Sequence, residues 1–191
     1  MLNPILYILS SFMNRKLKLE ELNRDSVEAF KAKKKNGIYI VLDNVRSLSN
    51  VGSIFRTADA FLINEILLCG ITACPPHREI TKTALGSTES VAWQYFDRTL
   101  DALDYLRSKN CNVYALEQAE NSIELNKLDL NKDDSIALIL GHEVNGVEQA
   151  VIDQCDGCIE IPQFGTKHSL NVSASGSIAI WEIWSKKQKA L

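Results

Sequence analysis

The sequence predicts an α/β fold in which a mainly parallel open sheet is flanked by helices. Short apolar runs alternate with amphipathic stretches along the 191 residues, which is the pattern of strands joined by helices. Several of these runs end in loops rich in glycine and polar residues, and open parallel sheets bind their ligands at such strand ends. A hydrophobic content of 46% is enough for one sizeable core.

The chain ahead of the first strand is predicted to be helical over residues 19–34. Asp25 is a candidate N-cap in this stretch, because Glu28 follows three residues later as in a capping box. Gly37 then breaks the helical pattern. The apolar run IYIVLD, residues 38–43, predicts a buried strand.

A polar loop is expected up to Asn50, followed by a helix over residues 51–62. The apolar run EILLCG, residues 65–70, predicts the second strand. The next segment is expected to be a loop, because Pro75 and Pro76 lack amide hydrogens and Pro76 favours extended geometry in the residue before it.

The remaining elements follow from the same alternation of apolar and amphipathic stretches. Strands are expected over residues 90–96, 111–118, 135–141 and 157–163. Helical segments are expected over residues 80–85, 99–109, 147–154 and 171–187. The predicted sheet therefore has six strands joined by helices.

One domain is expected, because 191 residues are short for two domains of about 100 to 200 residues each. Residues 1–36 are expected to form a basic helical extension, and residues 37–191 the domain itself. No apolar run approaches the roughly 18 residues of a membrane span, so no membrane partner is expected. The segment Met1–Met13 has no basic region ahead of its apolar stretch and no clear cleavage site, which favours a soluble, cytoplasmic protein.

The net charge of −3 argues against a polyanionic partner, but the charges are unevenly placed. Residues 97–160 carry 5 basic and 14 acidic residues, whereas residues 15–35 carry 8 basic and 4 acidic residues. The basic segment is either a solvated helical face or a surface for nucleic acid phosphates. Charge alone favours the solvated face.

The five cysteines are odd in number and scattered through apolar stretches, as is typical of reduced thiols in a cytosolic core. Only Cys155 and Cys158 form a CxxC pair. Because no second pair and no nearby histidine stands at zinc spacing, burial is favoured over a metal or redox role.

A first polar segment, NVGSIFRTADAF, lies at the start of the helix predicted after the first strand. Asn50 is a candidate N-cap, and the start of this helix would favour a phosphate. Arg56 lies about one and a half turns further on. Because its neighbours Ile54 and Phe55 are apolar, an arginine here is expected to need an anionic partner. The alternative is a well-capped helix without a ligand.

A second segment, LILGHEVNGV, contains a strand that ends at Gly141. Gly141 and Gly146 permit close approach of a ligand or a strained turn, and Glu143 is placed to hold a polar group. The segment matches neither GxxxxGK[ST] nor GxGxxG, which disfavours P-loop nucleotidases and dinucleotide enzymes. A glycine-rich turn with a structural role is the alternative.

A third segment, IPQFGTKHSLNVSASGSI, leads from the last strand into the last helix. Ser169, Asn171 and Ser173 offer side-chain hydrogen bonds beside the exposed amides of the helix start. An ordinary helix cap is the alternative. His168 is a candidate base, but a surface histidine is favoured because the sequence places no acid or nucleophile beside it.

These three segments, in this order and spacing, resemble the motifs of the SPOUT class of RNA methyltransferases, and specifically the TrmH/SpoU family of 2'-O-ribose methyltransferases. The resemblance spans residues 38–184. It implies a C-terminal deep trefoil knot, S-adenosylmethionine as cofactor and a homodimer, with the apolar C-terminal helix as a candidate interface. It also implies four cofactor-binding positions, which act largely through the backbone: Leu116, Gly141, Ile161 and Leu170.

The resemblance further implies the catalytic residues. Arg56 matches the family's catalytic arginine. Because a free arginine is effectively always protonated, stabilisation of the forming alkoxide and a nearby phosphate is favoured over a role as base. Four residues match the positions that orient Arg56 and the substrate: Asn50, Glu143, Ser169 and Asn171. His142 and Gly176 depart from the family pattern, and a glycine inside a helix costs about 1 kcal/mol relative to alanine.

The implied function is an S-adenosylmethionine-dependent RNA 2'-O-ribose methyltransferase. A tRNA substrate is favoured, with a D-loop guanosine as the target, because the first motif and the N-terminal extension look most like that subgroup. Ribosomal RNA is the alternative substrate. A knotted RNA-binding module without catalysis is disfavoured, because all five catalytic positions are matched.

Overall fold

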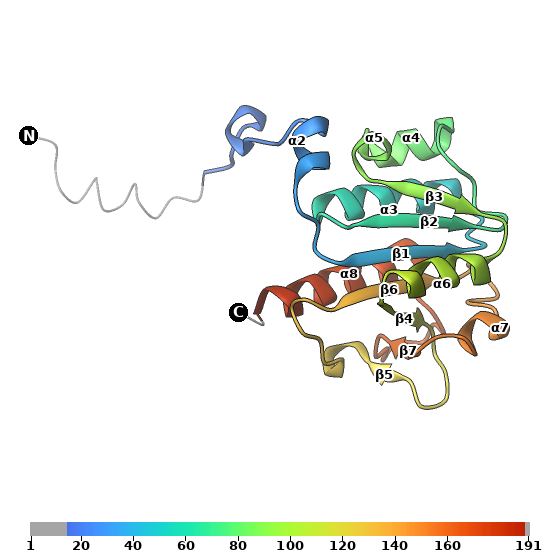
Figure 1. The fold of residues 1–191 in the computed structure, drawn as a ribbon. Coiled ribbons are helices and arrows are strands. Elements are labelled where there is room, and N and C mark those ends of the chain that lie inside the picture. Colours follow the sequence, from blue (N-terminus) through green and yellow to red (C-terminus); the bar gives the residue numbers. More distant parts are fainter. Residues whose placement is uncertain (1–14, 190–191) are drawn as a thin grey trace, which may run out of the picture.

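The computed structural model describes residues 15–189 and has a seven-stranded sheet at its centre (Figure 1). The strands are β1 (Ile38–Asp43), β2 (Glu65–Cys69), β3 (Trp93–Phe96), β4 (Cys111–Leu116), β5 (Ile123–Glu124), β6 (Ser135–Leu140) and β7 (Gly157–Glu160). Their order is β3-β2-β1-β6-β4-β7-β5, and all the paired neighbours run parallel. The predicted α/β class with a parallel open sheet is confirmed.

Helices cover both faces of this sheet. They are η1 (Leu19–Leu22), α2 (Val27–Ala32), α3 (Leu48–Ala60), α4 (Arg78–Ala84), α5 (Ser87–Ser90), α6 (Thr99–Ser108), η2 (Leu125–Lys127), α7 (Gln149–Ile152) and α8 (Val172–Lys189). The buried residues of α3 and α8 belong to one apolar cluster, and those of α6 and α7 belong to the other (Figure 1). The sheet is therefore the middle of three layers.

The alternation of side chains along each strand divides the core into two parts. In β1, Ile40 and Leu42 pack on the side of α3 and α8, whereas Val41 packs on the side of α6. Because both faces are covered, apolar side chains occur on both sides of the strand, and only Asp43 at its end is charged. This is why its predicted bounds, residues 38–43, agree with the structure.

The predicted elements after Gly37 are all present, with ends shifted by a few residues. Three short elements were not predicted: α5, β5 and η2. β5 has only 2 residues, too few for a readable alternation. The strand predicted over residues 90–96 begins only at Trp93, because residues 87–90 form α5.

The continuous helix predicted over residues 19–34 is wrong. The chain forms η1 and α2 as separate short helices. Ser26, and not Asp25, caps α2, since its hydroxyl accepts a hydrogen bond from the Ala29 amide at 3.2 Å. Phe30 of α2 is buried in the main apolar cluster, so this helix packs against the body of the protein.

Close packing of α8 on the sheet accounts for the glycine inside this helix. A Cβ atom at Gly176 would lie 2.7 Å from Cδ1 of Leu140, a buried side chain at the end of β6. Glycine thus lets the helix approach the strand end, which offsets its low helix propensity. The strand order does not by itself establish a trefoil knot, which stays a prediction.

Within residues 15–189, no helix has the length and hydropathy that a bilayer span requires. The expectation for Met1–Met13 falls outside these residues. The proposed division between residues 1–36 and 37–191 stays a prediction as well.

Candidate functional site

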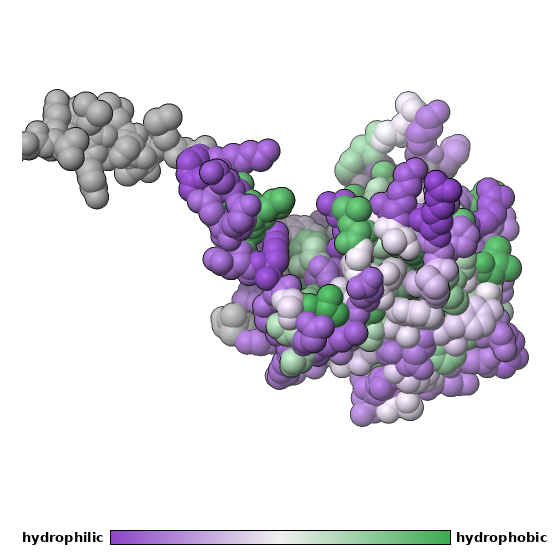
Figure 2. Space-filling model, turned by 90° about the horizontal axis from the view of Figure 1, so that it is seen from above, coloured by the Kyte–Doolittle hydropathy of each residue, from purple (hydrophilic) through white to green (hydrophobic). Residues whose placement is uncertain are grey.

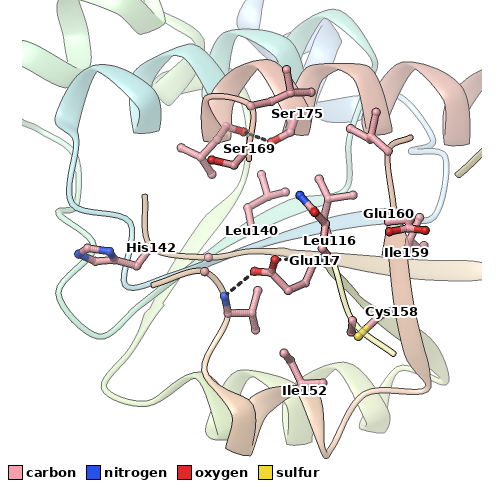
Figure 3. A pocket seen from close by; sticks show the side chains of 18 of the residues that line it. Leu116, Glu117, Leu140, His142, Ile152, Cys158, Ile159, Glu160, Ser169 and Ser175 are labelled. Carbon is pink, nitrogen blue, oxygen red and sulfur yellow. Dashed lines mark hydrogen bonds between the residues drawn. The ribbon is translucent and has the colours of Figure 1, made fainter. Parts of the chain in front are cut away.

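A cavity of about 640 Å³ lies where β4, β6 and β7 end. Its lining includes all four residues predicted to bind the cofactor: Leu116, Gly141, Ile161 and Leu170. Figure 3 shows Leu116 and Leu140 in the middle of the cavity, with Ser169 and Ser175 on one side and Ile152 and Cys158 on the other. Its volume falls within the range of roughly 300 to 1,000 Å³ that is usual for small-molecule sites.

A tight turn over residues 142–146 forms one wall of the cavity. The amide of His142 donates to the carbonyl of Gly146 at 3.0 Å, and the amide of Gly146 donates back at 2.8 Å. A Cβ atom at Gly141 would lie 2.2 Å from the Gly146 carbonyl carbon, so only glycine fits beside this turn. The close approach predicted at Gly141 is therefore made by the backbone of the turn itself.

The departure at His142 also has a structural role. Its Nδ1 accepts hydrogen bonds from the amides of Val144 at 3.0 Å and Asn145 at 3.4 Å. The imidazole thus closes the turn that it begins. The oxygen of an amide side chain could accept the same two hydrogen bonds. A small residue is therefore not needed at position 142 for this turn to form.

Glu117 is a cavity residue that the sequence analysis missed. It directly follows β4, and its Oε2 accepts a hydrogen bond from the Val147 amide at 3.2 Å (Figure 3). A Cβ atom at Gly146 would lie only 2.1 Å from the same oxygen. Glu117 thus holds the end of the turn in place. Its position at a strand end was the available signal, because ligand sites of open parallel sheets gather there.

Three of the predicted catalytic residues lie in one hydrogen-bonded chain, which we call the polar chain. Oε1 of Glu143 accepts from Nδ2 of Asn50 at 2.9 Å, and Oδ1 of Asn50 accepts from Nδ2 of Asn171 at 3.2 Å. The other carboxylate contacts are with the amides of Arg46 at 3.0 Å and Ser47 at 2.8 Å. The three segments singled out in the sequence therefore meet at one place.

The prediction that Asn50 caps α3 is wrong. The helix begins at Leu48, and the hydroxyl of Ser47 accepts from the Asn50 amide at 3.4 Å. Asn50 therefore lies in the first turn, with its side chain directed to Glu143 and Asn171. Asn171 takes the capping role at the other helix: its Oδ1 accepts from the amides of Ser173 and Ala174 in the first turn of α8.

The charge of Glu143 is favoured by this environment. Burial alone would raise the pKa of the carboxyl group. The hydrogen bonds from the Arg46 amide, the Asn50 side chain and the Ser47 amide outweigh that effect and hold the pKa below its usual value. Glu143 therefore acts as an ionised acceptor that joins the turn at residues 142–146 to the start of α3.

Arg56 and Ser169 lie apart from the polar chain. Ser169 is exposed and lines the cofactor-sized cavity. Arg56 is on the exposed side of α3 and makes no hydrogen bond or ion pair with any other residue of the range 15–189. Ile54 and Phe55 point into the core while Arg56 faces solvent, so an anionic partner of Arg56 stays a prediction and would come from a ligand.

These features can be compared with known proteins. Residues 37–181 match the model of the SpoU rRNA Methylase family, which accounts for most of the chain. The chain belongs to the SpoU family. Members of this family use S-adenosylmethionine, and solved structures with that cofactor bound exist among those similar to this chain.

Individual relatives agree with this membership. A tRNA/rRNA methyltransferase of Borreliella burgdorferi, described as uncharacterized, is 32% identical and matches 82% of this chain and 67% of its own. An AdoMet-bound rRNA methyltransferase from Sinorhizobium meliloti is 27% identical with a TM-score of 0.73, over 88% of this chain and 62% of its own. The TrmH/SpoU tRNA modifying enzyme of A. aeolicus has the same fold, with 23% identity, a TM-score of 0.74 and coverages of 85% and 81%. The chain thus spans 67% or less of the first two proteins' length.

The remaining sequence candidates lie outside the cavity or are buried. His168 is exposed, and its carbonyl accepts a hydrogen bond from Gln118 at 2.7 Å. Burial raises the pKa of the Cys155 thiol to about 12 and also raises that of Cys158. Within residues 15–189, the histidine, cysteine and acidic side chains form no group of three that could hold a metal ion.

The turn of the SpoU-family cavity gives a stability prediction at Gly146. This residue has φ of 69°, and a Cβ atom would collide with Glu117. We expect Gly146→Ala to destabilise the protein by about 2 kcal/mol, since a left-handed conformation alone costs about 1 to 2 kcal/mol in a residue other than glycine. Thermal unfolding should then show a decrease in Tm of roughly 4 to 8 °C.

Gly165 provides the matched control for this change. A Cβ atom at Gly165 would meet nothing within 4 Å. Gly165→Ala should change the free energy of unfolding by no more than about 0.5 kcal/mol, as is usual at open surface positions. Its Tm should therefore stay close to that of the wild type. Equal Tm values for the Gly146→Ala variant and the wild type would show that the turn adapts to a side chain.

Proposed function

We propose that this chain is an S-adenosylmethionine-dependent RNA 2'-O-ribose methyltransferase. The observation that carries the proposal is the polar chain of Asn50, Glu143 and Asn171 beside a cavity of about 640 Å³. Family membership supports methyl transfer to RNA. The match of Arg56 and Ser169 to the motifs of 2'-O-ribose methyltransferases supports the ribose hydroxyl as the acceptor.

The cavity fits S-adenosylmethionine in size and in the chemistry of its lining. Backbone groups at Gly141, Ile161 and Leu170 would hold the cofactor, because they border the cavity at strand ends and in the loop before α8. Leu116 and Leu140 would add apolar contact surface. When bound, the cofactor supplies a methyl group on a positively charged sulfur, which is a good leaving group.

The protein's own residues would then orient the acceptor and favour loss of its proton. Arg56 carries a permanent positive charge on an exposed face, where it would stabilise the 2'-oxygen as negative charge develops on it. The polar chain would fix the turn at residues 142–146 relative to α3, the helix that carries Arg56. Ser169 would add a hydroxyl at the cavity rim. Alignment of the two reactants is the main contribution expected of such a site.

A tRNA substrate with a D-loop guanosine as the target is favoured, and ribosomal RNA is the alternative. The basic segment over residues 15–35 supports an RNA partner, and Figure 2 shows the part next to the grey residues standing away from the body with a mostly hydrophilic surface. Some of its charge is already paired: Arg15 with Glu21, and Lys33 with Asp25. RNA contacts are therefore expected from the remaining basic residues.

A homodimer formed through α8 is part of the proposal. Ile178 and Trp181 of this helix are 44% and 51% exposed, which is unusual for large apolar side chains. The Trp181 ring lies 5.3 Å from that of Trp184 and 5.6 Å from that of Phe61. This aromatic group on α3 and α8 offers a surface for a second copy. A cytoplasmic location is also proposed, in keeping with an RNA substrate.

The test is transfer of labelled methyl groups from S-adenosylmethionine to unmodified tRNA and, separately, to ribosomal RNA. Nuclease digestion and nucleoside identification then follow. We expect a 2'-O-methylnucleoside in the tRNA pool. The same product in ribosomal RNA alone would reverse the choice of substrate, and a methylated base would contradict ribose specificity. Cofactor binding without transfer to either RNA would point to a missing partner or a different acceptor, whereas absence of both transfer and cofactor binding would favour a non-catalytic RNA-binding module.

A further inference from the structure

A second hollow of about 530 Å³ lies between α3, α4 and α8, apart from the cofactor-sized cavity. We call it the cationic groove. Its lining is Ser53, Arg56, Thr57, Ala60, Phe61, Lys82, Thr83 and Ser177. Two of these side chains are cations and none is an acid. A hollow of this composition favours an anion.

Neither cation is neutralised by the rest of the described chain. Arg56 and Lys82 are both exposed, and residues 15–189 supply no carboxylate within ion-pair distance of either. Asp59, the acid nearest to Arg56 along α3, instead accepts a hydrogen bond from Ser90 at 2.5 Å. Two like charges that border one hollow repel each other unless an anion lies between them.

The walls of the cationic groove are fixed by close packing. A Cβ atom at Gly52 would lie 2.1 Å from Oγ1 of Thr83, so α3 and α4 meet at backbone distance. The hydroxyl of Thr83 reaches the Ser49 carbonyl at 3.2 Å. On the other side, the hydroxyls of Thr57 and Ser177 are 2.9 Å apart and join α3 to α8. The helix that carries Lys82 is therefore held rigidly against the helix that carries Arg56.

The groove is also close to the polar chain along α3. Asn50 and Arg56 are separated by six residues, which corresponds to about 9 Å of helix rise. The Phe61 ring borders the groove as well, where it packs against Trp181 and Trp184. The groove thus places a second cation, Lys82, beside the proposed catalytic residue.

We propose that Lys82 binds a backbone phosphate of the substrate RNA in the cationic groove and so places the target ribose beside Arg56. This inference rests on the proposed function, since it assigns a substrate contact to that site. Lys82 is an RNA-binding residue in this scheme, whereas Arg56 acts on the reacting oxygen. The contact with the phosphate depends on the positive charge of Lys82 and not on a particular hydrogen-bond geometry.

The experiment compares Lys82→Gln with Lys132→Gln in the full chain. Lys132 is an exposed lysine in the loop before β6 and lines neither the cavity nor the groove. We expect the slope of log K for RNA binding against log salt concentration to become shallower by about 1 in Lys82→Gln only. The KM for RNA should rise by about threefold to tenfold at low salt for one lost phosphate contact. Cofactor binding should stay at the wild-type level, because Lys82 does not line the cofactor-sized cavity.

Lys82→Arg should restore the wild-type slope, because it restores the charge. An unchanged slope in Lys82→Gln, or an equal change in Lys132→Gln, would overturn the assignment. If the wild type methylates RNA but the salt dependence of RNA binding is unchanged in Lys82→Gln, only the assignment of Lys82 fails. If the wild-type protein binds no RNA, the proposed function fails together with it.

Discussion

Replacing Arg56 by alanine is expected to lower the rate of methyl transfer by about 100- to 1,000-fold, the usual effect of removing a group that stabilises developing negative charge. The fold should be unaffected, because Arg56 is exposed and its side chain makes no hydrogen bond or ion pair within residues 15–189. Cofactor binding should also be retained, since Arg56 does not line the cofactor-sized cavity. Single-turnover rates and calorimetric titration with S-adenosylmethionine measure these quantities separately.

Arg78→Ala is the matched control, because Arg78 is also an exposed arginine of the helical layer and lines neither hollow. Its rate should match that of the wild type. A fully active Arg56→Ala variant would remove Arg56 from the mechanism. Loss of cofactor binding in that variant would instead place Arg56 in the cofactor site.

Replacing Glu143 by alanine is expected to affect both stability and catalysis. The change leaves the amides of Arg46 and Ser47 and the Nδ2 group of Asn50 without their acceptor. The free energy of unfolding should decrease by about 1 to 3 kcal/mol, which is the usual cost of unpaired polar groups. Methyl transfer should fall by about 100-fold, because a displacement of about 1 Å in a positioning element has an effect of that size.

The stabilising effect of Glu143 should depend on pH. Its pKa in the folded protein lies below the usual value of 4.5. The stabilisation is therefore fully present above pH 4.5 and is lost as the pH falls through the folded-state pKa. Urea unfolding of the wild type and Glu143→Gln should show a difference in stability at pH 7 that shrinks below pH 4.5.

Asp129→Asn serves as the control for this pH series. Asp129 is an exposed carboxylate, and none of the hydrogen bonds within residues 15–189 involves its side chain. Its removal should change stability little at any pH, since isolated surface charges contribute little. A Glu143→Gln variant as stable as the wild type at pH 7 would show that the negative charge of Glu143 does not contribute to stability.

The fold could be predicted from the sequence because buried strands are apolar along their length. The run over residues 38–43 became β1 with the predicted bounds, and each longer run became a strand. The N-terminal helices could not be predicted as well, since short helices depend on local caps such as Ser26 more than on periodicity.

The candidate site was predicted in part. The strand-end residues Leu116 and Gly141 line the cavity because parallel strands end at one edge of the sheet. The role of Asn50 could not be predicted from the local sequence, because Ser47 and Asn50 are equally good N-cap residues. Only the hydrogen bond between Asn50 and Glu143, 93 residues further on, distinguishes them. The exposure of Arg56 could not be inferred from its apolar neighbours Ile54 and Phe55, because sequence neighbours on a helix lie on different faces.

The polar chain has a consequence for the order of events during synthesis and folding. Its two links join residues that are 93 and 121 positions apart in the sequence. Contacts of such long range form slowly, because each requires the closure of a long loop. Asn171 lies just ahead of α8, so a nascent chain that still lacks its last helix has the sheet but an incomplete site. The polar chain is therefore completed only after the segment that carries Asn171 has emerged and folded.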